Sequence, residues 1–379
     1  MKVLVHSPFD NLPCEGFRKQ RYWLMAEAFA AAGHEVSYFT SDFNHGTKGR
    51  RAASSGAVDG IDVHLVHAPA YSKNVSLRRA LSHSAYARRF EREAMAVAAP
   101  DIVVSAVPTL GAALAAMRIA RRSGAKFVLD VQDAWPETFY RLLPRGLSWL
   151  GRVLFAPMHH AARRLYREAD AVTGVSERYR ALTGRGDFLV AYHGIEASGE
   201  PAPALPRRGG AIAYAGNLGE GYDLDTVIEA VRKEKSLTLD IAGSGPREAV
   251  LRRSAADLVA EGRVRFHGYL SGERLGALLR TSSVGVVPMR DDSWVGLPYK
   301  LCDYLAAGLP VASSLHGECG ELLARESAGC TYDFGSSESF LAAVRRIVDG
   351  GMVGAVRLPK CLDASRIYAE YVRRIVRPQ

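Results

Sequence analysis

The stretch GLPYKLCDYLAAGLPV, residues 296–311, is apolar at nearly every position except Lys300 and Asp303. Pro298 fits the first turn of a helix, so we expect a helix over residues 299–307. Charges three residues apart on a helix lie on nearly the same face. The flanking leucines imply burial, and buried charges require partners. A binding site is therefore favoured over a surface Lys–Asp pair, which would contribute only about 0.2–0.5 kcal/mol.

Two more segments have the pattern of a strand, a glycine-rich turn and a helix start: YAGNLGEGYDLDT, residues 214–226, and IAGSGPRE, residues 241–248. Backbone N–H groups in such turns can hold a phosphate. Asp223 and Asp225 resemble a metal-binding pair, but acids at this place more often cap the helix, and we prefer that interpretation. Arg247 lies in a first helical turn, where a cation is unfavourable unless an anion is bound, which weakly favours a ligand site.

In the first half, SPFDNLPCEGFRKQRYW (residues 7–23) follows a predicted strand that ends near His6. We expect a helix to begin close to Gly16, where its first N–H groups could hold an anion. The cationic side chains here are Arg18, Lys19 and Arg21. A solvated basic first turn explains them equally well. A G-x-G-x-x-G fingerprint does not follow this strand, so a hydride-transfer enzyme is disfavoured.

The segment LDVQDAWPETFYRLLP, residues 129–144, has three acids just past another predicted strand end, beside Trp135; they are Asp130, Asp133 and Glu137. Loops at strand ends are where such domains carry reactive groups. A carboxylate beside an aromatic ring suits sugar recognition and charge stabilisation. The alternative, slightly favoured on these residues alone, is that Asp133 caps the next helix and Trp135 is a core residue.

Around these loops, apolar strands alternate with helices, which predicts parallel sheets with helices on both faces. Strands are expected over residues 3–6, 36–40, 101–105, 127–131 and 171–175, and, in a second series, over 211–215, 237–241, 264–267 and 284–287. Helices are expected over residues 21–32, 110–122, 225–232, 246–260, 271–279 and 362–376. The fold class is therefore α/β, with two doubly wound domains sharing a cleft, and ligands should bind at carboxyl ends of strands.

Domain boundaries follow from the Pro- and Gly-rich segment GEPAPALPRRGG. We expect a first domain over residues 1–198, a linker over 199–210 and a second domain over 211–358. Residues 359–379 should form a helical segment that packs back on the first domain.

Composition narrows the class of partner. The chain is 48% hydrophobic, and its apolar runs are shorter than the roughly 18–20 residues of a membrane span. Its start has the pattern of a strand rather than of a signal peptide. The five cysteines are scattered and lack metal-ligand spacing, which argues against zinc sites and disulfide frameworks and favours a cytoplasmic location. The net charge of +9 indicates an anionic partner: nucleic acid, anionic lipid or nucleotide phosphate.

Taken in order, these segments resemble the retaining glycosyltransferases of family 4, which have the GT-B fold of two Rossmann-like domains facing across a cleft. The resemblance covers nearly the whole chain and rests on EGFRKQRYWLMAEAFAAAGHEV, YAGNLG with GYDLDT, AGSGPRE, FHGYLSGERL and PYKLCDYLAAGLPVASS. SDFNHGTKGRR and QDAWPE resemble the branch that builds bacterial lipopolysaccharide and other surface polysaccharides.

The resemblance implies transfer of a sugar from a nucleotide diphosphate, with UDP favoured, to a glycan or lipid-linked acceptor, with retained configuration and without a metal cofactor. The donor phosphates are expected at Gly16, Asn217, Gly219, Arg247 and Lys300, and the nucleoside at Gly243, Gly268, Tyr299 and Asp303. The sugar is expected at Glu318 and Glu321, and the acceptor on the first domain, with Asp133 and Glu137 as catalytic candidates.

The chain departs from the family pattern at the nucleotide site. The family has two Glu residues there; Asp303 occupies the place of the second, which usually holds the ribose, and Val295 stands where the first is expected. The family's two phosphate-binding cations fall on Asn217 and Tyr222. Lys300 and Arg247 are the best remaining cations, and we expect Lys300 to replace the missing pair.

Two basic stretches, residues 73–93 and 141–168, mix Arg with apolar side chains, as in helices that lie on anionic membranes. Solvated basic helices with an apolar core side are nearly as good an interpretation. Nucleic-acid binding is disfavoured because no helix-turn-helix, zinc finger or aromatic RNA motif is present. A sugar-nucleotide epimerase of the same fold and a weakly active sugar-nucleotide-binding protein stay as alternatives.

Overall fold

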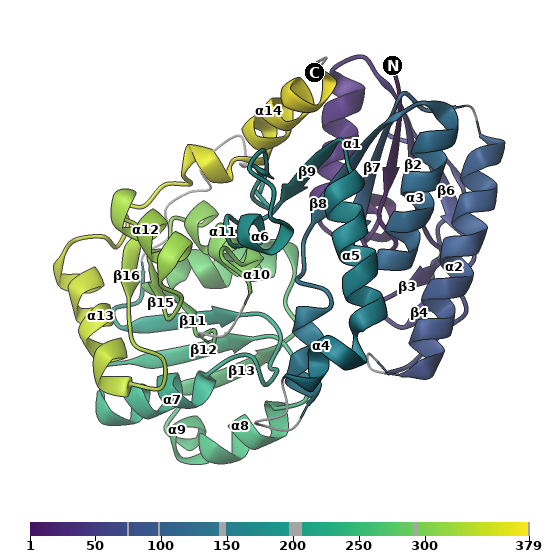
Figure 1. Ribbon diagram of the computed structural model, residues 1–379. Helices are drawn as coiled ribbons and strands as arrows, with labels where there is room; N and C mark the ends of the chain where they lie inside the picture. The colour runs from purple at the N-terminus through teal and green to yellow at the C-terminus, as the bar shows by residue number, and fades with distance from the viewer. Residues whose placement is uncertain (74–75, 98, 144–148, 197–206, 291–293, 378–379) are drawn as a thin grey trace. The chain divides into compact units, whose positions relative to one another are not determined.

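The computed structural model describes residues 1–73, 76–97, 99–143, 149–196, 207–290 and 294–377. The chain forms two compact units, Met1–Tyr192 with Ser365–Gln379, and His193–Ala364 (Figure 1). Each unit is built on one mainly parallel sheet, so the predicted class of two Rossmann-like α/β domains is confirmed. Among the described residues, no helix is both long and apolar enough to cross a membrane.

The first unit is an eight-stranded sheet in the order β10-β9-β8-β7-β1-β2-β6-β5. Only the edge strand β5 is antiparallel to its neighbour. Burial of every residue of β7 explains why its sequence, IVVSAV, is a continuous apolar run rather than an alternating one. The strands are β1 (Lys2–His6), β2 (Glu35–Ser41), β5 (Gly56–Val58), β6 (Ile61–Val66), β7 (Ile102–Val107), β8 (Lys126–Val131), β9 (Ala171–Gly174) and β10 (Leu189–Val190).

Helices cover both faces of this sheet. In Figure 1, α2, α3 and α5 lie side by side on one face, and right-handed crossovers put α1 on the other. A short hairpin of β3 (Phe43–Asn44) and β4 (Gly49–Arg50) follows β2. The helices are α1 (Arg21–Ala31), α2 (Leu77–Ala96), α3 (Leu110–Ser123), α4 (Leu150–Leu154), α5 (Ala156–Glu168), α6 (Arg178–Thr183) and α14 (Ala364–Val376), with 3₁₀ turns η1 (Pro13–Glu15) and η2 (Glu137–Leu142).

The prediction that a helix begins close to Gly16 is wrong. Pro13 starts the separate 3₁₀ turn η1, and Gly16 ends it in the left-handed conformation, with φ of 77°. The α-helix begins only at Arg21, after an extended residue, Gln20. Gly16 therefore lies in the loop before α1 rather than at its N-terminus.

The last helix belongs to the first compact unit. In α14 the ring of Tyr371 meets Phe29 of α1 edge-on, with 6.2 Å between ring centroids. Lys126 Nζ donates to the carbonyl of Ile375 at 2.8 Å. Tyr368 and Tyr371 are almost fully buried, so the end of the chain completes the core of the unit that begins it.

The second unit is a six-stranded parallel sheet in the order β13-β12-β11-β14-β15-β16. Its strands are β11 (Ala211–Ala215), β12 (Thr238–Ala242), β13 (Val264–Gly268), β14 (Val284–Val287), β15 (Val311–Ser313) and β16 (Gly329–Thr331). Its helices are α7 (Leu224–Lys233), α8 (Glu248–Ser254), α9 (Ala256–Ala260), α10 (Gly272–Thr281), α11 (Tyr299–Ala306), α12 (Gly317–Arg325) and α13 (Ser337–Asp349), with a 3₁₀ turn η3 (Lys360–Leu362). The predicted single helix over residues 246–260 is two helices, because Ala255 leaves helical geometry and packs into the core.

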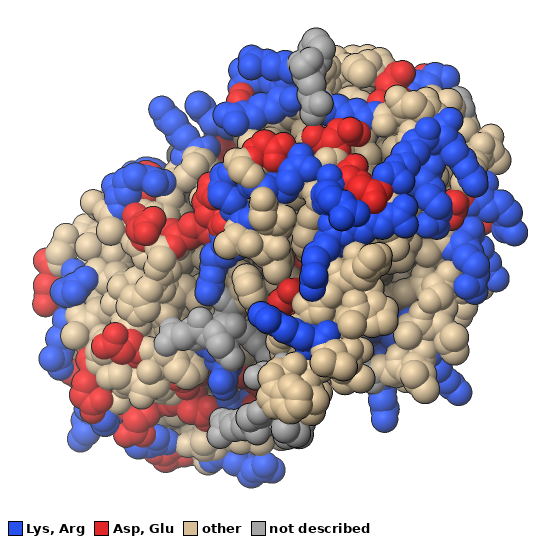
Figure 2. Space-filling model, in the orientation of Figure 1, with Lys and Arg blue, Asp and Glu red and all other residues tan. Residues whose placement is uncertain are grey.

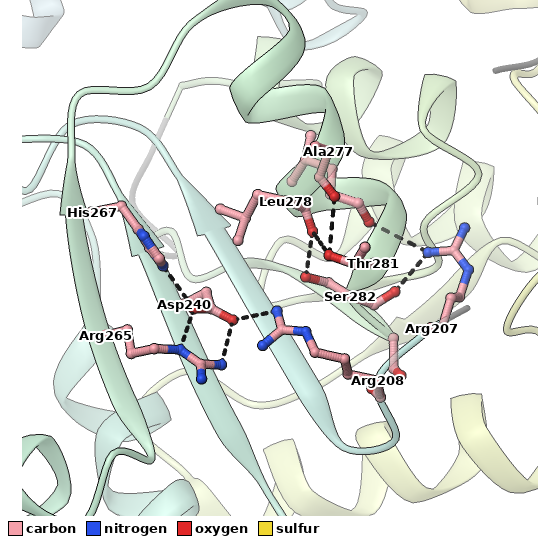
Figure 3. A network of polar contacts seen from close by, with 11 residues as sticks. Arg207, Arg208, Asp240, Arg265, His267, Ala277, Leu278, Thr281 and Ser282 are labelled. Atoms are coloured by element: carbon pink, nitrogen blue, oxygen red, sulfur yellow. Dashed lines mark hydrogen bonds and ion pairs between the residues drawn. The ribbon is translucent and has the colours of Figure 1, made fainter. Parts of the chain in front are cut away.

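The predicted linker is partly fixed to the second unit. Residues 199–206 lie outside the described part of the chain, whereas Arg207 donates to the carbonyls of Ser282 at 2.6 Å and Gly308 at 2.7 Å. Arg208 donates to the buried Asp240 carboxylate at 2.6 Å (Figure 3). The units divide after Tyr192, before the proline-rich segment, because Ile195 pairs with the chain at Asp363 in the second unit.

Candidate functional site

Two glycine turns interlock at the carboxyl ends of β11 and β12. The Gly216 N–H donates to the carbonyl of Ala242, and the Leu218 N–H donates to the carbonyl of Ser244, both at 2.9 Å. A Cβ atom on Gly243 would lie 1.8 Å from the Gly216 carbonyl oxygen, so a side chain there is excluded. The two turns predicted as phosphate cradles therefore form one surface, and glycine is required for their close approach.

Helix α11 is fixed beside these turns by the hydroxyl of Tyr304. This hydroxyl accepts from the Ala215 N–H at 2.8 Å and donates to the carbonyl of Val286 at 3.2 Å. The bonds join α11 to the ends of the two central strands, β11 and β14. They place the first turn of α11, which carries Lys300, under the Gly216 turn.

Lys300 is 7% exposed and lies against two tyrosine rings. Its Nζ is 4.2 Å from the ring centroid of Tyr214 and 3.8 Å from that of Tyr222. It donates to Tyr214 Oη at 3.1 Å. A Cβ atom on Gly216 would lie 3.0 Å from this Nζ, so the glycine leaves room for the ammonium group. Tyr222, where the resemblance implied a lost phosphate-binding cation, packs its ring against the Lys300 ammonium group.

The electrostatics of Lys300 favour an anionic ligand. Burial lowers the pKa of Lys300 well below its ordinary value of 10.5, and the nearby Asp303 carboxylate only partly offsets this. A phosphate at the glycine turns would stabilise the ammonium form and raise the pKa again. The buried Lys300 thus lies beside the two interlocked glycine turns, with Asp303 one helical turn further along α11. The ligand-binding roles given to both residues stay predictions.

Arg247, the second predicted phosphate-binding cation, forms ion pairs with acidic residues of its own unit. Its guanidinium lies 2.8 Å from the carboxylate of Asp225 and 3.7 Å from that of Glu220. Asp223 accepts from the Thr226 N–H at 3.1 Å, so the prediction that it caps α7 is confirmed. A phosphate would have to compete with two carboxylates for Arg247, and Lys300 is therefore the better candidate.

The other residues predicted around the donor lie partly at the glycine turns, where the carbonyl of Gly268 accepts from the Gly243 N–H at 2.7 Å, and partly elsewhere in the second unit. Tyr299 stacks on His193 with 3.8 Å between ring centroids. The remaining ones lie in turns or on helix α12: Asn217 and Gly219 in the first glycine turn, Gly268 at the end of β13, Glu318 half-buried in the first turn of α12, and Glu321 exposed one turn later. The roles given to these residues stay predictions.

In the first unit, Asp133 is held within its own loop. Its carboxylate accepts from the indole Nε1 of Trp135 at 3.1 Å and from Thr138 Oγ1 at 2.8 Å. The helix-cap alternative is wrong, because Pro136 stands at the cap position of η2. Trp135 is 8% exposed, as a core residue would be. The hydrogen bond from the indole therefore lets Asp133 orient Trp135, and this role does not require a substrate.

Glu137 has one carboxylate oxygen, Oε2, that is buried without a hydrogen-bond partner among the described residues. Its other oxygen lies 3.6 Å from His159 Nδ1, and His159 Nε2 lies 2.6 Å from Tyr140 Oη. Buried carboxylate oxygens are normally bonded, so this oxygen is an exception to the rule. His159 was not among the predicted residues; its pairing with Glu137 depends on the packing of α5 against the loop after β8.

Two roles were predicted for Arg21, as a cation of an anion site or as part of a solvated basic turn, and both predictions are wrong. Arg21 is fully buried and pairs with Asp130, with Nε–Oδ2 at 2.8 Å and Nη2–Oδ1 at 2.7 Å. Tyr22 and Thr173 also donate to this carboxylate. Arg21 Nη1 donates to the carbonyls of Ala191 and Tyr192 at the end of the unit. The pair is thus structural, neither an anion site nor a solvated turn.

Comparison with known proteins identifies both units. Residues 20–190 match the model of a glycosyl transferase 4-like domain, and residues 210–350 match that of glycosyl transferases group 1. The Escherichia coli K12 protein WcaI, named as a colanic acid biosynthesis glycosyl transferase, is 26% identical over 293 residues, covering 72% of this chain and 70% of that protein. The amylovoran biosynthesis glycosyltransferase AmsK of Erwinia amylovora is 29% identical over 146 residues, covering 37% of this chain and 36% of that protein.

Solved structures agree on the fold. Sucrose-phosphate synthase from Thermosynechococcus elongatus has a TM-score of 0.70 at 15% identity, covering 99% of this chain and 96% of that chain. HepE of Anabaena, solved with UDP and glucose, has a TM-score of 0.63 at 14% identity, covering 99% and 95%. The two family matches together span most of the chain, which therefore belongs to the glycosyltransferases, with a 4-like domain followed by a group 1 domain in the GT-B fold.

Proposed function

We propose that this glycosyltransferase transfers a hexosyl group from a nucleotide-diphosphate sugar, with UDP favoured, to a glycan or lipid-linked acceptor during the synthesis of a bacterial surface polysaccharide. The site of Lys300 is the observation that carries the proposal. A buried ammonium group below two interlocked glycine turns suits a diphosphate, which would supply the charge partner that burial demands. The names of WcaI and AmsK support the polysaccharide role.

Within this proposal, Lys300 binds the donor diphosphate and replaces the two cations absent at Asn217 and Tyr222. Asp303, one turn further along α11, binds the ribose hydroxyls. Since Lys300 would stabilise the negative charge that develops on the leaving diphosphate, its contribution grows in the transition state. No metal is required for this step in the proposal.

The catalytic acids are proposed in the first unit, with retention of the anomeric configuration. Glu137 is the stronger candidate, since one of its oxygens is buried and has no hydrogen-bond partner in the described residues. Asp133 would act on the acceptor through Trp135, whose indole it holds. A carboxylate near the reacting carbon can stabilise an oxocarbenium-like charge.

A transfer assay tests the proposed function. The purified chain is incubated with UDP-sugars and a membrane extract or a synthetic lipid-linked sugar, and UDP release and product are followed. The proposal expects UDP release that requires acceptor, and a product whose anomeric proton coupling matches that of the donor. Conversion of one UDP-sugar into another without acceptor would instead identify an epimerase. Donor binding without turnover under any acceptor would identify a binding protein.

We further propose that the enzyme is cytoplasmic and contacts an anionic membrane through α4. Trp149, Val153 and Leu154 on and beside this helix are 65%, 70% and 62% exposed. Basic side chains gather over the neighbouring helices α3 and α5 (Figure 2); they include Arg118, Arg121, Arg122, Arg163, Arg164 and Arg167. Exposed apolar residues beside cations are the composition of a peripheral membrane surface.

A further inference from the structure

A cluster of aromatic rings lies over the carboxyl ends of the first unit's strands. It consists of Phe9, His45, Tyr71, His83 and Trp135, hereafter the aromatic cluster. Its members come from the loops after β1, β3, β6 and β8 and from α2. The ring centroid of Phe9 lies 5.1 Å from that of His45 and 5.4 Å from that of His83. The ring centroid of Tyr71 lies 5.8 Å from that of His45 and 6.0 Å from that of His83. Trp135 joins at 6.2 Å from His83.

Two cations lie within the aromatic cluster. The guanidinium carbon of Arg79 is 5.9 Å from the ring centroid of Phe9, 6.0 Å from Tyr71 and 5.7 Å from Trp135. The Nζ of Lys48 is 5.1 Å from the ring of Tyr71. Both cationic side chains are half-buried and keep some exposure to solvent, so a ligand can reach them.

The histidines of the cluster are neutral and oriented by their neighbours. Lys48 Nζ lies 3.3 Å from His45 Nδ1, and Tyr71 Oη lies 2.6 Å from the same nitrogen. Because an ammonium group can only donate, this nitrogen accepts, and Nε2 of His45 carries the proton. Burial, then Lys48 and Arg79, lowers the pKa of His45 to about 4. Burial, then Arg79 and His45, lowers the pKa of His83 to about 3.

The backbone at Lys48 has a conformation that is uncommon for a lysine. Lys48 adopts φ of 58° in the β3–β4 hairpin, in the left-handed region that glycine fills without strain. A lysine at such a position has an unfavourable conformation and an ammonium group whose pKa is lowered, first by burial and then by Arg79. An anion between the two cations would relieve their mutual repulsion.

We propose that the aromatic cluster with Arg79 and Lys48 is the acceptor subsite and that it binds a sugar carrying an anionic group. The proposal rests on the proposed function. The half-buried ring of Phe9 offers an apolar face for the C–H face of a pyranose. Arg79 and Lys48 bind the anion, and the protonated nitrogens of the histidines donate to hydroxyls. The anion is either a phosphate at the reducing end or a carboxylate on the sugar ring, and both meet Arg79 through paired hydrogen bonds.

The test uses the full chain and three probes: methyl glucoside, glucuronic acid and glucose 1-phosphate. Binding of each is measured by saturation-transfer NMR and titration, with and without excess UDP, so that occupation of a nucleotide site is separated from the acceptor subsite. We expect at least one anionic probe to bind at least tenfold more tightly than methyl glucoside. Preference for glucose 1-phosphate indicates a phosphate-linked acceptor, and preference for glucuronic acid indicates an acidic sugar.

Three variants locate the site. R79Q and K48G should each weaken binding of the anionic probe at least tenfold. K48G should also fold at least as stably as the wild type, because glycine relieves the strain of the left-handed conformation. R78Q, the exposed neighbour of Arg79 on α2, should bind the probe as the wild type does. UDP affinity should be the same in all three. The proposal is overturned if the neutral probe binds as tightly as the anionic ones, or if R78Q and R79Q have equal effects. Absence of UDP binding with probe binding intact would instead reject the proposed donor.

Discussion

Lys300 is the residue on which the proposed donor site depends most. Its ammonium group touches two tyrosine rings and donates to Tyr214 Oη, and its helix is fixed to the sheet by Tyr304. Removing a charged hydrogen-bond donor from a ligand typically costs about 1.5–3 kcal/mol. The effect should be on ligand binding rather than on folding, because a buried ammonium group is unfavourable for the unliganded protein.

For K300M we therefore expect the affinity for UDP to fall at least about tenfold, the equivalent of about 1.4 kcal/mol, while the unfolding midpoint is unchanged or raised. Calorimetric titration gives the affinity and thermal unfolding gives the stability. K233M, which removes an exposed lysine paired with Glu338 in the same unit, is the matched control and should bind UDP normally. Equal losses in both variants would contradict a specific role for Lys300.

The lowered pKa of Lys300 predicts a pH dependence of donor binding. In the unliganded enzyme the pKa of Lys300 is well below the ordinary value of 10.5, so its ammonium group loses its proton at a lower pH than an exposed lysine does. Because the proposed diphosphate ligand would bind the protonated form of Lys300, UDP affinity should decrease as pH rises through the lowered pKa, and it should be constant at lower pH. Titrations between neutral and alkaline pH should show this decrease in the wild type. A decrease of the same size in K300M would mean that another group titrates.

The buried pair of Arg21 and Asp130 should govern the stability of the first unit. Burial by itself raises the pKa of Asp130, but Arg21 and the bonds from Thr173 and Tyr22 outweigh it, so the pKa is lowered. R21M should cost about 3–5 kcal/mol of unfolding free energy, since it leaves a buried carboxylate without its cation. The Asp130 contribution is present above pH 3.8 and is lost as pH falls through the lowered pKa.

Denaturant unfolding measures that cost. R118M breaks the more exposed pair of Arg118 with Glu91 and serves as the control, with an expected effect of about 0–1 kcal/mol. A loss for R21M no larger than that of R118M would show that the buried pair is not an important contributor.

At the scale of elements, the strands β1, β2, β7, β8, β9, β11, β12, β13 and β14 were predictable because each is a short apolar run. The strands β5, β6, β10, β15 and β16, which complete the two sheets, were not predicted. The helix that carries Lys300 and Asp303, and the burial of Lys300, were also predictable, because both residues and their apolar neighbours lie within one short segment. Arg21 and Asp130 are 109 positions apart, and no local pattern links them. The pairing of Glu137 with His159 and the aromatic cluster likewise depend on loops brought together by the sheet. The break at Ala255 has no glycine or proline to mark it.

Helix α4 should be the element that binds a membrane. Substituting Trp149 and Val153 by Ser removes exposed apolar surface without opening the core, since both side chains are more than 60% exposed. We expect this double variant to lose binding to vesicles that contain anionic lipid, and we expect salt to release the wild type. Sedimentation with vesicles measures both. Val259 on α9, also exposed, provides a control substitution that should leave binding unchanged. No binding of the wild type at low salt would reject the proposal.

For the whole molecule, the last helix ties the end of the chain to the unit that contains its start. Tyr368, Tyr371, Val372 and Ile375 are each at most 4% exposed. Burying one such side chain contributes about 1.5–3 kcal/mol. Truncation after Asp363 should therefore destabilise the first unit strongly, although the second unit keeps its sheet.

Hydrogen exchange resolves the two units. In the truncated chain we expect faster exchange in β1, β2 and β8, and unchanged protection in β11 and β12. A chain truncated after residue 377 is the control and should match the full chain. Loss of protection in both units alike would contradict the assignment of α14 to the first.

The most direct test of the central claim is a thermal-shift and calorimetric screen of nucleotide sugars with the wild type and K300M. The panel should contain UDP-, GDP- and ADP-sugars at concentrations up to the millimolar range. The account predicts that one nucleotide class, with UDP favoured, raises the melting temperature of the wild type and that K300M loses most of this shift. Absence of any shift across the panel, or an equal shift in K300M, would contradict it.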